Sequence, residues 1–148
     1  MPSFAGDTII APGAFPGAFA AACNSQMDLA NNVEVDVAGA TITVVTTKVN
    51  AQFLCIGSFY VSMLAASAGI AIGKLHVDGV VQAGFANFTG LSSTPERGNV
   101  AQSWIGTLAT AGSHTLKLRA VGPGQTGTPT TAAHRINTVS TTITVLVF

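Results

Sequence analysis

Apolar and polar residues alternate along most of the chain from residue 32 onward, the period expected of half-buried β-strands. The valines of residues 33–37 alternate with two acidic residues, and the apolar residues of 115–120 alternate with Thr, Lys and Arg. Further strands are predicted at 41–48, 100–109 and 136–148, where β-branched and aromatic residues are frequent. The pattern predicts seven or eight strands, no long helix and no internal repeat, as in a two-sheet sandwich or a barrel.

The segment 52–64 is apolar on both of its expected faces. Its odd positions are apolar apart from Gly57, and its even positions add Leu54, Ile56, Tyr60 and Leu64. An antiparallel strand with one face in water alternates more cleanly than this. We therefore expect both faces of this strand to be covered, the second by a subunit interface.

Residues 74–83 carry the sharpest local signal. Two apolar runs flank Asp78-Gly79, and Asp-Gly suits a two-residue type I′ turn because both central residues need positive φ. This segment predicts a β-hairpin.

Residues 1–31 differ from the rest of the chain. They are rich in Gly, Ala, Pro and Phe, and they lack a clear period of either kind. We interpret them as an extended N-terminal arm whose aromatic residues need a hydrophobic groove on the same subunit or a neighbour. A short helix over 17–29, favoured by Ala20 to Ala22, is the alternative. Residues 32–148 then form one domain, and the fold class is all-β, a two-sheet antiparallel sandwich.

Composition adds an argument for assembly. Charged residues make up 8% of the chain and sum to a net charge of zero, whereas soluble domains average about 25% charged residues. The six basic residues are spread too thinly for a phosphate-binding face, so nucleic acid is not an expected partner. A chain with so few charges is prone to associate, which favours permanent assembly.

No residue pattern supports catalysis, a cofactor or a metal. Gly122–Gly127 matches a dinucleotide-binding pattern by letter, but no βαβ unit surrounds it. The three histidines lack metal-ligand spacing, and no nucleophile, base and carboxylate converge in the sequence. Glu34 and Asp36 share a strand face, which is expected to be a wet polar face. Cys23 and Cys55 are expected to be buried thiols, and a bridge between them is left open.

Two apolar stretches resemble targeting segments. Ile9 to Cys23 lacks the basic residues of a signal peptide, since no Lys or Arg precedes Lys48. Val49 to Gly73 is long enough to span a bilayer, but its polar residues and the lack of basic flanks favour a buried strand and a loop. A membrane is therefore not an expected partner.

Three segments together resemble small jelly-roll modules of tailed bacteriophages, found in capsid decoration (cement) proteins, head fibres and tail-tip domains. They are Lys74–Val81 with its Val-Asp-Gly turn, Ser103–Leu108, and Ala111–Ala120 with its Gly-Ser-His-Thr-Leu-Lys-Leu-Arg-Ala strand; a Thr/Val-rich strand at 140–148 follows. The resemblance covers about residues 40–148, and residues 1–31 match none of its motifs.

The resemblance implies a homotrimer on the capsid surface of a virion, bound to the major capsid protein through apolar interfaces and without enzymatic activity. The residues expected to contact partners are Phe4, Phe15, Phe19, Tyr60 and Trp104. One alternative is a receptor- or carbohydrate-binding module of a tail tip or fibre, using loops 85–99 and 121–135. Another is a trimeric cell-surface or secreted adhesin domain.

Overall fold

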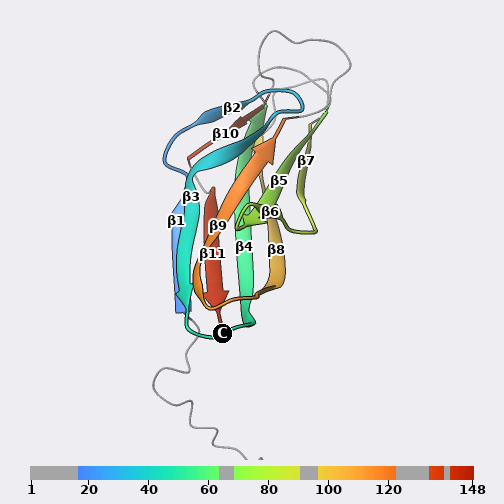
Figure 1. Cartoon of the computed structure of the whole chain (residues 1–148). Helices are drawn as coiled ribbons and strands as arrows, with labels where there is room; N and C mark the ends of the chain where they lie inside the picture. The colour runs from blue at the N-terminus through green and yellow to red at the C-terminus, as the bar shows by residue number, and fades with distance from the viewer. Residues whose placement is uncertain (1–16, 64–68, 91–96, 123–133, 139–140) are drawn as a thin grey trace, which may run out of the picture.

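The chain folds as two antiparallel β-sheets packed face to face (Figure 1). The structure, a computed structural model, describes residues 17–63, 69–90, 97–122, 134–138 and 141–148. Every segment with regular structure within them is a strand, which confirms the all-β jelly-roll sandwich. Among the described residues, no helix is long and apolar enough to cross a membrane.

The first sheet is built around one long central strand. Strand β4 (Ala51–Met63) pairs along one edge with β8 (Arg97–Leu108), and along the other with β11 (Thr142–Val147) and β10 (His134–Ile136). Strand β1 (Gly17–Ala22) pairs with β11, and β2 (Met27–Leu29) pairs with β10. The order across the lower part of this sheet is therefore β1-β11-β4-β8.

The second sheet has β9 (Gly112–Val121) at its centre, between β3 (Glu34–Thr46) and β5 (Gly69–Val77). The short strands β6 (Val80–Val81) and β7 (Ala86–Gly90) both pair with β5. The register of β3 on β9 shifts between Asp36 and Thr41, where Gly39 has a φ of 81°. A side chain at Gly39 would collide with the carbonyl oxygen of Ala22, so glycine lets β3 bend closely over the end of β1.

The Asp78-Gly79 hairpin is confirmed. The φ angles of Asp78 and Gly79 are 51° and 84°, and the turn joins β5 to β6. Both values lie in the left-handed region that a type I′ turn requires. The local sequence alone therefore decides this element.

The predicted boundaries of the arm are wrong in part. Residues 17–22 and 27–29 are strands of the first sheet, and neither an arm nor a helix. Leu29 is fully buried and Cys23 is 5% exposed, so this stretch belongs to the sandwich. Alanine by itself favours a helix, so pairing with the β-branched β11 makes this segment a strand. Residues 1–16 lie outside the described residues.

Other differences concern strand ends. The two strands predicted over 33–48 are one strand, β3, and the strand predicted over 136–148 is split into β10 and β11. Residues 86–90, expected to be loop, form β7 on the edge of β5. In each case pairing with a distant segment decides what the local pattern left open.

The hydrophobic core lies between the two sheets. Within it, aromatic rings pack closely against glycines. Phe53 and Phe59 of β4 and Trp104 of β8 are at most 3% exposed. A Cβ added at Gly73 would lie 2.5 Å from ring carbons of Phe59, and one at Gly106 would lie 2.7 Å from the ring of Phe53. The rings therefore pack directly on the backbone of the facing or neighbouring strand.

We predict that Gly73→Ala lowers the free energy of unfolding by about 1–3 kcal/mol, because the added methyl group overlaps the Phe59 ring. Urea unfolding measures the change. Replacing Phe59 by the smaller Leu makes room, so Phe59→Leu should cost less stability in the Gly73→Ala background than in the natural chain. Additive costs would show that the two residues do not compete for space.

Candidate interaction surface

The outer face of the first sheet carries three uncharged rows of side chains. In strands of this sheet every second residue points away from the core, and the strand registers align these residues across β1, β11, β4 and β8. From the lower end upward, the rows are Ala18–Leu146–Leu54–Ile105, Ala20–Thr144–Ile56–Ser103 and Ala22–Thr142–Ser58–Ala101. We call these twelve positions the uncharged face.

The uncharged face is open to solvent and partly apolar. Ile105 is 82% exposed and Ile56 is 44% exposed, while Leu54 and Leu146 are half-buried. Strands lie about 4.8 Å apart and same-face residues about 6.7 Å apart, which gives about 400 Å² for twelve positions. Apolar patches of about 300–600 Å² on monomers are often functional. The sequence predicted that both faces of β4 are covered. Within the described residues its inner face is buried and nothing covers its outer face, so cover by a second subunit stays a prediction.

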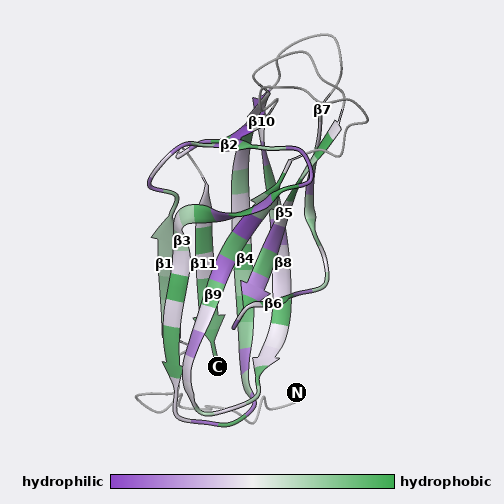
Figure 2. Cartoon of the chain, turned by 45° about the horizontal axis from the view of Figure 1, so that its top comes forward, coloured by the Kyte–Doolittle hydropathy of each residue, from purple (hydrophilic) through white to green (hydrophobic). Residues whose placement is uncertain are grey.

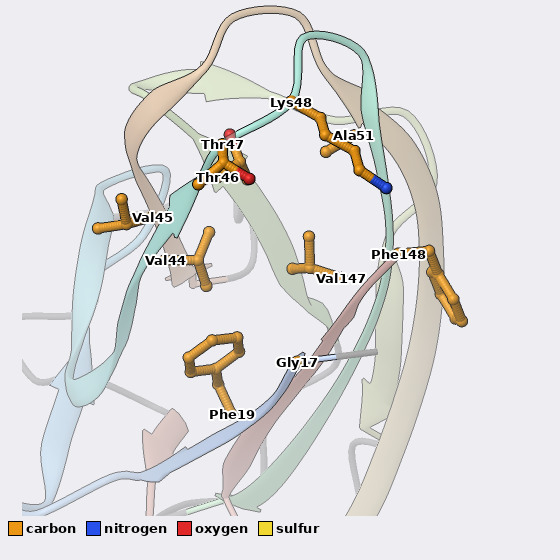
Figure 3. A pocket seen from close by; sticks show the side chains of 10 residues that line it. All are labelled: Gly17, Phe19, Val44, Val45, Thr46, Thr47, Lys48, Ala51, Val147 and Phe148. Carbon is orange, nitrogen blue, oxygen red and sulfur yellow. The ribbon is translucent and has the colours of Figure 1, made fainter. Parts of the chain in front are cut away.

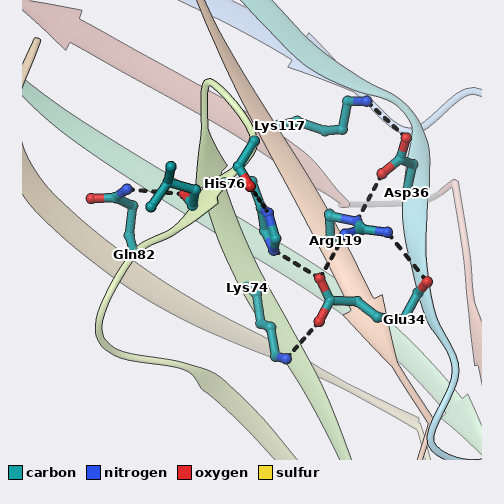
Figure 4. A network of polar contacts seen from close by, with 9 residues as sticks. Glu34, Asp36, Lys74, His76, Gln82, Lys117 and Arg119 are labelled. Atoms are coloured by element: carbon teal, nitrogen blue, oxygen red, sulfur yellow. Dashed lines mark hydrogen bonds and ion pairs between the residues drawn. The ribbon is translucent and has the colours of Figure 1, made fainter.

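The outer face of the second sheet carries a compensated cluster of charges instead (Figures 2 and 4). The Glu34 carboxylate lies 2.6 Å from Lys74 Nζ, 2.7 Å from His76 Nε2 and 3.0 Å from Arg119 Nη1. Asp36 lies 2.7 Å from Lys117 Nζ and 2.8 Å from Arg119 Nε. As predicted, Glu34 and Asp36 share a polar strand face, and basic residues of β5 and β9 neutralise them.

These contacts set the protonation of both carboxyl groups. Burial acts to raise the pKa of Glu34, but the hydrogen bond and charge of Lys74, with Arg119 and His76, outweigh it and lower the pKa. The hydrogen bond from Lys117 is the largest influence on Asp36 and lowers its pKa despite partial burial. Both groups are therefore held as carboxylates that already have partners, which does not favour a role in proton transfer.

His114 ties two turns together. Its Nδ1 lies 2.7 Å from Asp78 Oδ2 in the β5–β6 turn, and its Nε2 lies 2.9 Å from the Thr110 carbonyl oxygen before β9. Both neighbours are acceptors, so both bonds form only when both ring nitrogens carry protons. The Asp78 hydrogen bond and the Thr110 carbonyl raise the pKa of His114. This buried histidine therefore stabilises the turns best when it is charged.

The two cysteines are buried thiols, as the sequence predicted. Cys23 and Cys55 are both free and buried, and burial raises the pKa of the Cys55 thiol to about 12. Within the described residues no group of three or more His, Cys, Asp or Glu side chains is placed to hold a metal ion. The dinucleotide-like segment lies outside the described residues apart from Gly122, and so does the side chain of His134.

The residues predicted to contact partners differ in their burial. Trp104 is 3% exposed and its Nε1 donates to the Gly84 carbonyl oxygen at 2.8 Å, so it belongs to the core of its own subunit and its assignment to a partner is wrong. Tyr60 is half-buried and follows Ile56 and Ser58 along the outer side of β4. Phe19 is 37% exposed, and Phe4 and Phe15 lie outside the described residues.

Phe19 lines a cavity of about 270 Å³ at the lower end of the sandwich (Figure 3). The cavity lies where β1 begins and β3 and β11 end, and Val44 and Val147 line it from the two sheets. Thr46, Thr47 and Lys48 form its polar side. The sequence analysis named Phe19 as a contact residue. It could not group Ala18, Leu54, Ile105 and Leu146, because these residues become neighbours only through the pairing register of the strands.

No family model and no curated protein sequence matches the chain. Its fold is similar to that of Eiger TNF from S. frugiperda, with a TM-score of 0.57 and 12% identity over 90% of this chain and 93% of that one. The globular domain of zebrafish complement 1qA protein matches with a TM-score of 0.50 and 14% identity, over 89% of this chain and 96% of that one. A chain of infectious bursal disease virus, Gx strain, matches with a TM-score of 0.52 and 13% identity; 90% of this chain corresponds to 32% of that one. These similarities show a jelly-roll fold.

We predict that the stability of the protein falls as pH rises from about 5.5 to about 8.5, because the raised pKa of His114 favours the folded state while the imidazole is protonated. The contribution is complete below the ordinary pKa of 6.5 and is lost as pH rises through the higher folded pKa. Urea midpoints at the two pH values measure it. The glutamine in His114→Gln does not titrate, so the urea midpoint of this variant should differ less between the two pH values. If the difference is as large as in the natural chain, other groups cause it.

Proposed function

We propose that the chain is a structural protein of a virus particle without enzymatic activity, a homotrimer that decorates a bacteriophage head by burying uncharged surface. The observation that carries the proposal is the uncharged face itself, since the charged residues of the first sheet, Arg97 and the Arg135–Asp28 ion pair, lie beyond its three rows. The second sheet holds its charges in internal ion pairs, while the three rows of the first sheet contain none.

A partner for the uncharged face must itself be uncharged, because a charged group brought against it loses water and gains no counter-ion. A second copy of the chain meets this condition, since it carries the same face. Burial of about 400 Å² contributes at most on the order of 10 kcal/mol per subunit, because the coefficient of about 25 cal/mol per Å² holds for apolar surface and four of the twelve positions are Ser or Thr. Association itself costs about 4–15 kcal/mol, so further contacts are needed for a stable particle.

The similarity in fold to a chain of infectious bursal disease virus supports a role in a virus particle. The same fold occurs in Eiger TNF and in the globular domain of complement 1qA, so the fold by itself does not select the virus. The resemblance of residues 74–81, 103–108 and 111–120 to bacteriophage decoration modules supports that choice. The loops of the alternative, carbohydrate-binding hypothesis lie largely outside the described residues.

We predict that Ile105→Asp converts the oligomer into a monomer of 14.9 kDa, because it places an unpaired charge on the buried surface. Light scattering coupled to size exclusion measures the mass, and circular dichroism checks that the fold is kept. Val80→Asp is the matched control, since Val80 is 64% exposed on β6 of the other sheet. A natural chain that is monomeric would overturn self-assembly, and an Ile105→Asp trimer would exclude this face as the interface.

The location is tested by electron microscopy of virus particles labelled with an antibody against the chain. Label over the head surface is expected. Label at the tail tip would instead support the receptor- or carbohydrate-binding module, and label on cells alone would support the adhesin domain.

A further inference from the structure

The cavity beside Phe19 has the size and composition of a site for side chains of a peptide. Its volume of about 270 Å³ falls below the ~300–1,000 Å³ of common small-molecule pockets. Phe19, Val44 and Val147 face it from three strands, and Phe148 points away from them (Figure 3). Val44 is only 1% exposed, whereas Phe19 is 37% exposed. The hydrophobic core is therefore open to solvent beside Phe19.

The strand next to the cavity has a free edge. Among the described residues, β1 pairs with β11 on one side and forms no ladder on the other. Its sequence, Gly-Ala-Phe-Ala-Ala-Ala, contains no charge, no proline and no bulge, the features that usually protect an edge from pairing with another chain. An extended segment can therefore add to β1 by main-chain hydrogen bonds and place alternate side chains at the cavity.

The segment that precedes β1 has matching chemistry. Residues 1–16 contain Phe4, Phe15 and two isoleucines, with Asp7 as their single charged side chain. They are joined to Gly17, which lines the cavity. Fully extended, sixteen residues span at most about 55 Å, which reaches a neighbouring subunit.

The attachment point favours a neighbour's cavity over the chain's own. A residue before proline is sterically biased toward extended conformations, and both Ala11 and Phe15 precede a proline. A chain that continues the line of β1 backward past Gly17 leaves the sandwich at the end where its own cavity lies. Returning to that cavity would need the segment to reverse its direction before Gly17, whereas a neighbour's cavity can be reached without a reversal.

We infer that residues 1–16 of one copy add to the free edge of β1 in a second copy and place a phenylalanine in the cavity lined by Phe19, Val44 and Val147. The inference rests on the self-assembly proposed above and names a second contact of the same assembly. It supplies surface that the uncharged face lacks, since stable interfaces bury about 800 Å² per partner and that face offers about half as much.

The test is cross-linking between two copies of the full chain that carry tags of different size and are expressed together. One copy has Ala14→Cys, which keeps Phe4 and Phe15, and the other has Thr47→Cys at the exposed rim of the cavity. Thr43→Cys is the matched control, because Thr43 is exposed on β3, which ends one residue before Thr47, but it does not line the cavity. The natural Cys23 and Cys55 are buried and stay in place.

After mild oxidation, we expect a mixed-tag disulfide dimer on non-reducing gels for Thr47→Cys, at least about fivefold more abundant than for Thr43→Cys, because a disulfide needs Cα atoms within about 7 Å. Equal yields, or no dimer, would overturn the inference. A chain carrying both Ala14→Cys and Thr47→Cys that cross-links only within itself would assign the segment to its own cavity and also overturn it. Light scattering of the same samples separates the two proposals, since an oligomer without this cross-link contradicts the inference alone, whereas a monomer contradicts self-assembly.

Discussion

The pairing of β4 on both of its edges is the constraint on which the rest of the structure depends. Because β8 takes one edge and β10 and β11 take the other, β4 lies at the centre of the first sheet, and its side chains alternate between the two faces of that sheet. Phe53, Cys55 and Phe59 fill the core between the sheets, which leaves Leu54, Ile56 and Tyr60 on the outside. The same register places Ile105, Leu146 and Ala18 beside Leu54. One strand thus creates both the core and the uncharged face.

The second sheet shows the opposite solution for an outer face. Lys74, Lys117 and Arg119 lie opposite Glu34 and Asp36 across three strands, so each carboxylate has more than one cation within 3.0 Å. Such a cluster lies on the exterior with little need for a partner, because its charges are satisfied within the subunit. Exposed ion pairs of this kind add little to stability, about 0–1 kcal/mol each. Their main effect is to keep this side of the molecule in water.

The elements that the sequence predicts well are those whose geometry is decided locally. The Asp78-Gly79 turn needs only two residues with positive φ, and residues 115–120 of β9 alternate between Thr, Lys or Arg and apolar residues. Strand β1 could not be predicted, because Gly-Ala-Phe-Ala-Ala-Ala has no alternation of its own and becomes a strand by pairing with β11. Trp104 shows the same limit for the site. Its neighbours Ser103 and Ile105 point outward, but only the pairing of Cys55 with Trp104 shows that the indole enters the core.

The low charge of the chain follows from this division of faces. Ion pairs take up most of the charged residues of the second sheet, and the charges of the first sheet, Arg97 and the Arg135–Asp28 pair, lie outside the uncharged face. A monomer would leave Ile105 and Ile56 in water at zero net charge, a state that promotes association. The free edge of β1 adds a second surface that association would cover. The uncharged face covers the outer side of the first sheet, and β1 is an edge strand of that sheet. One assembly can therefore bury both surfaces together.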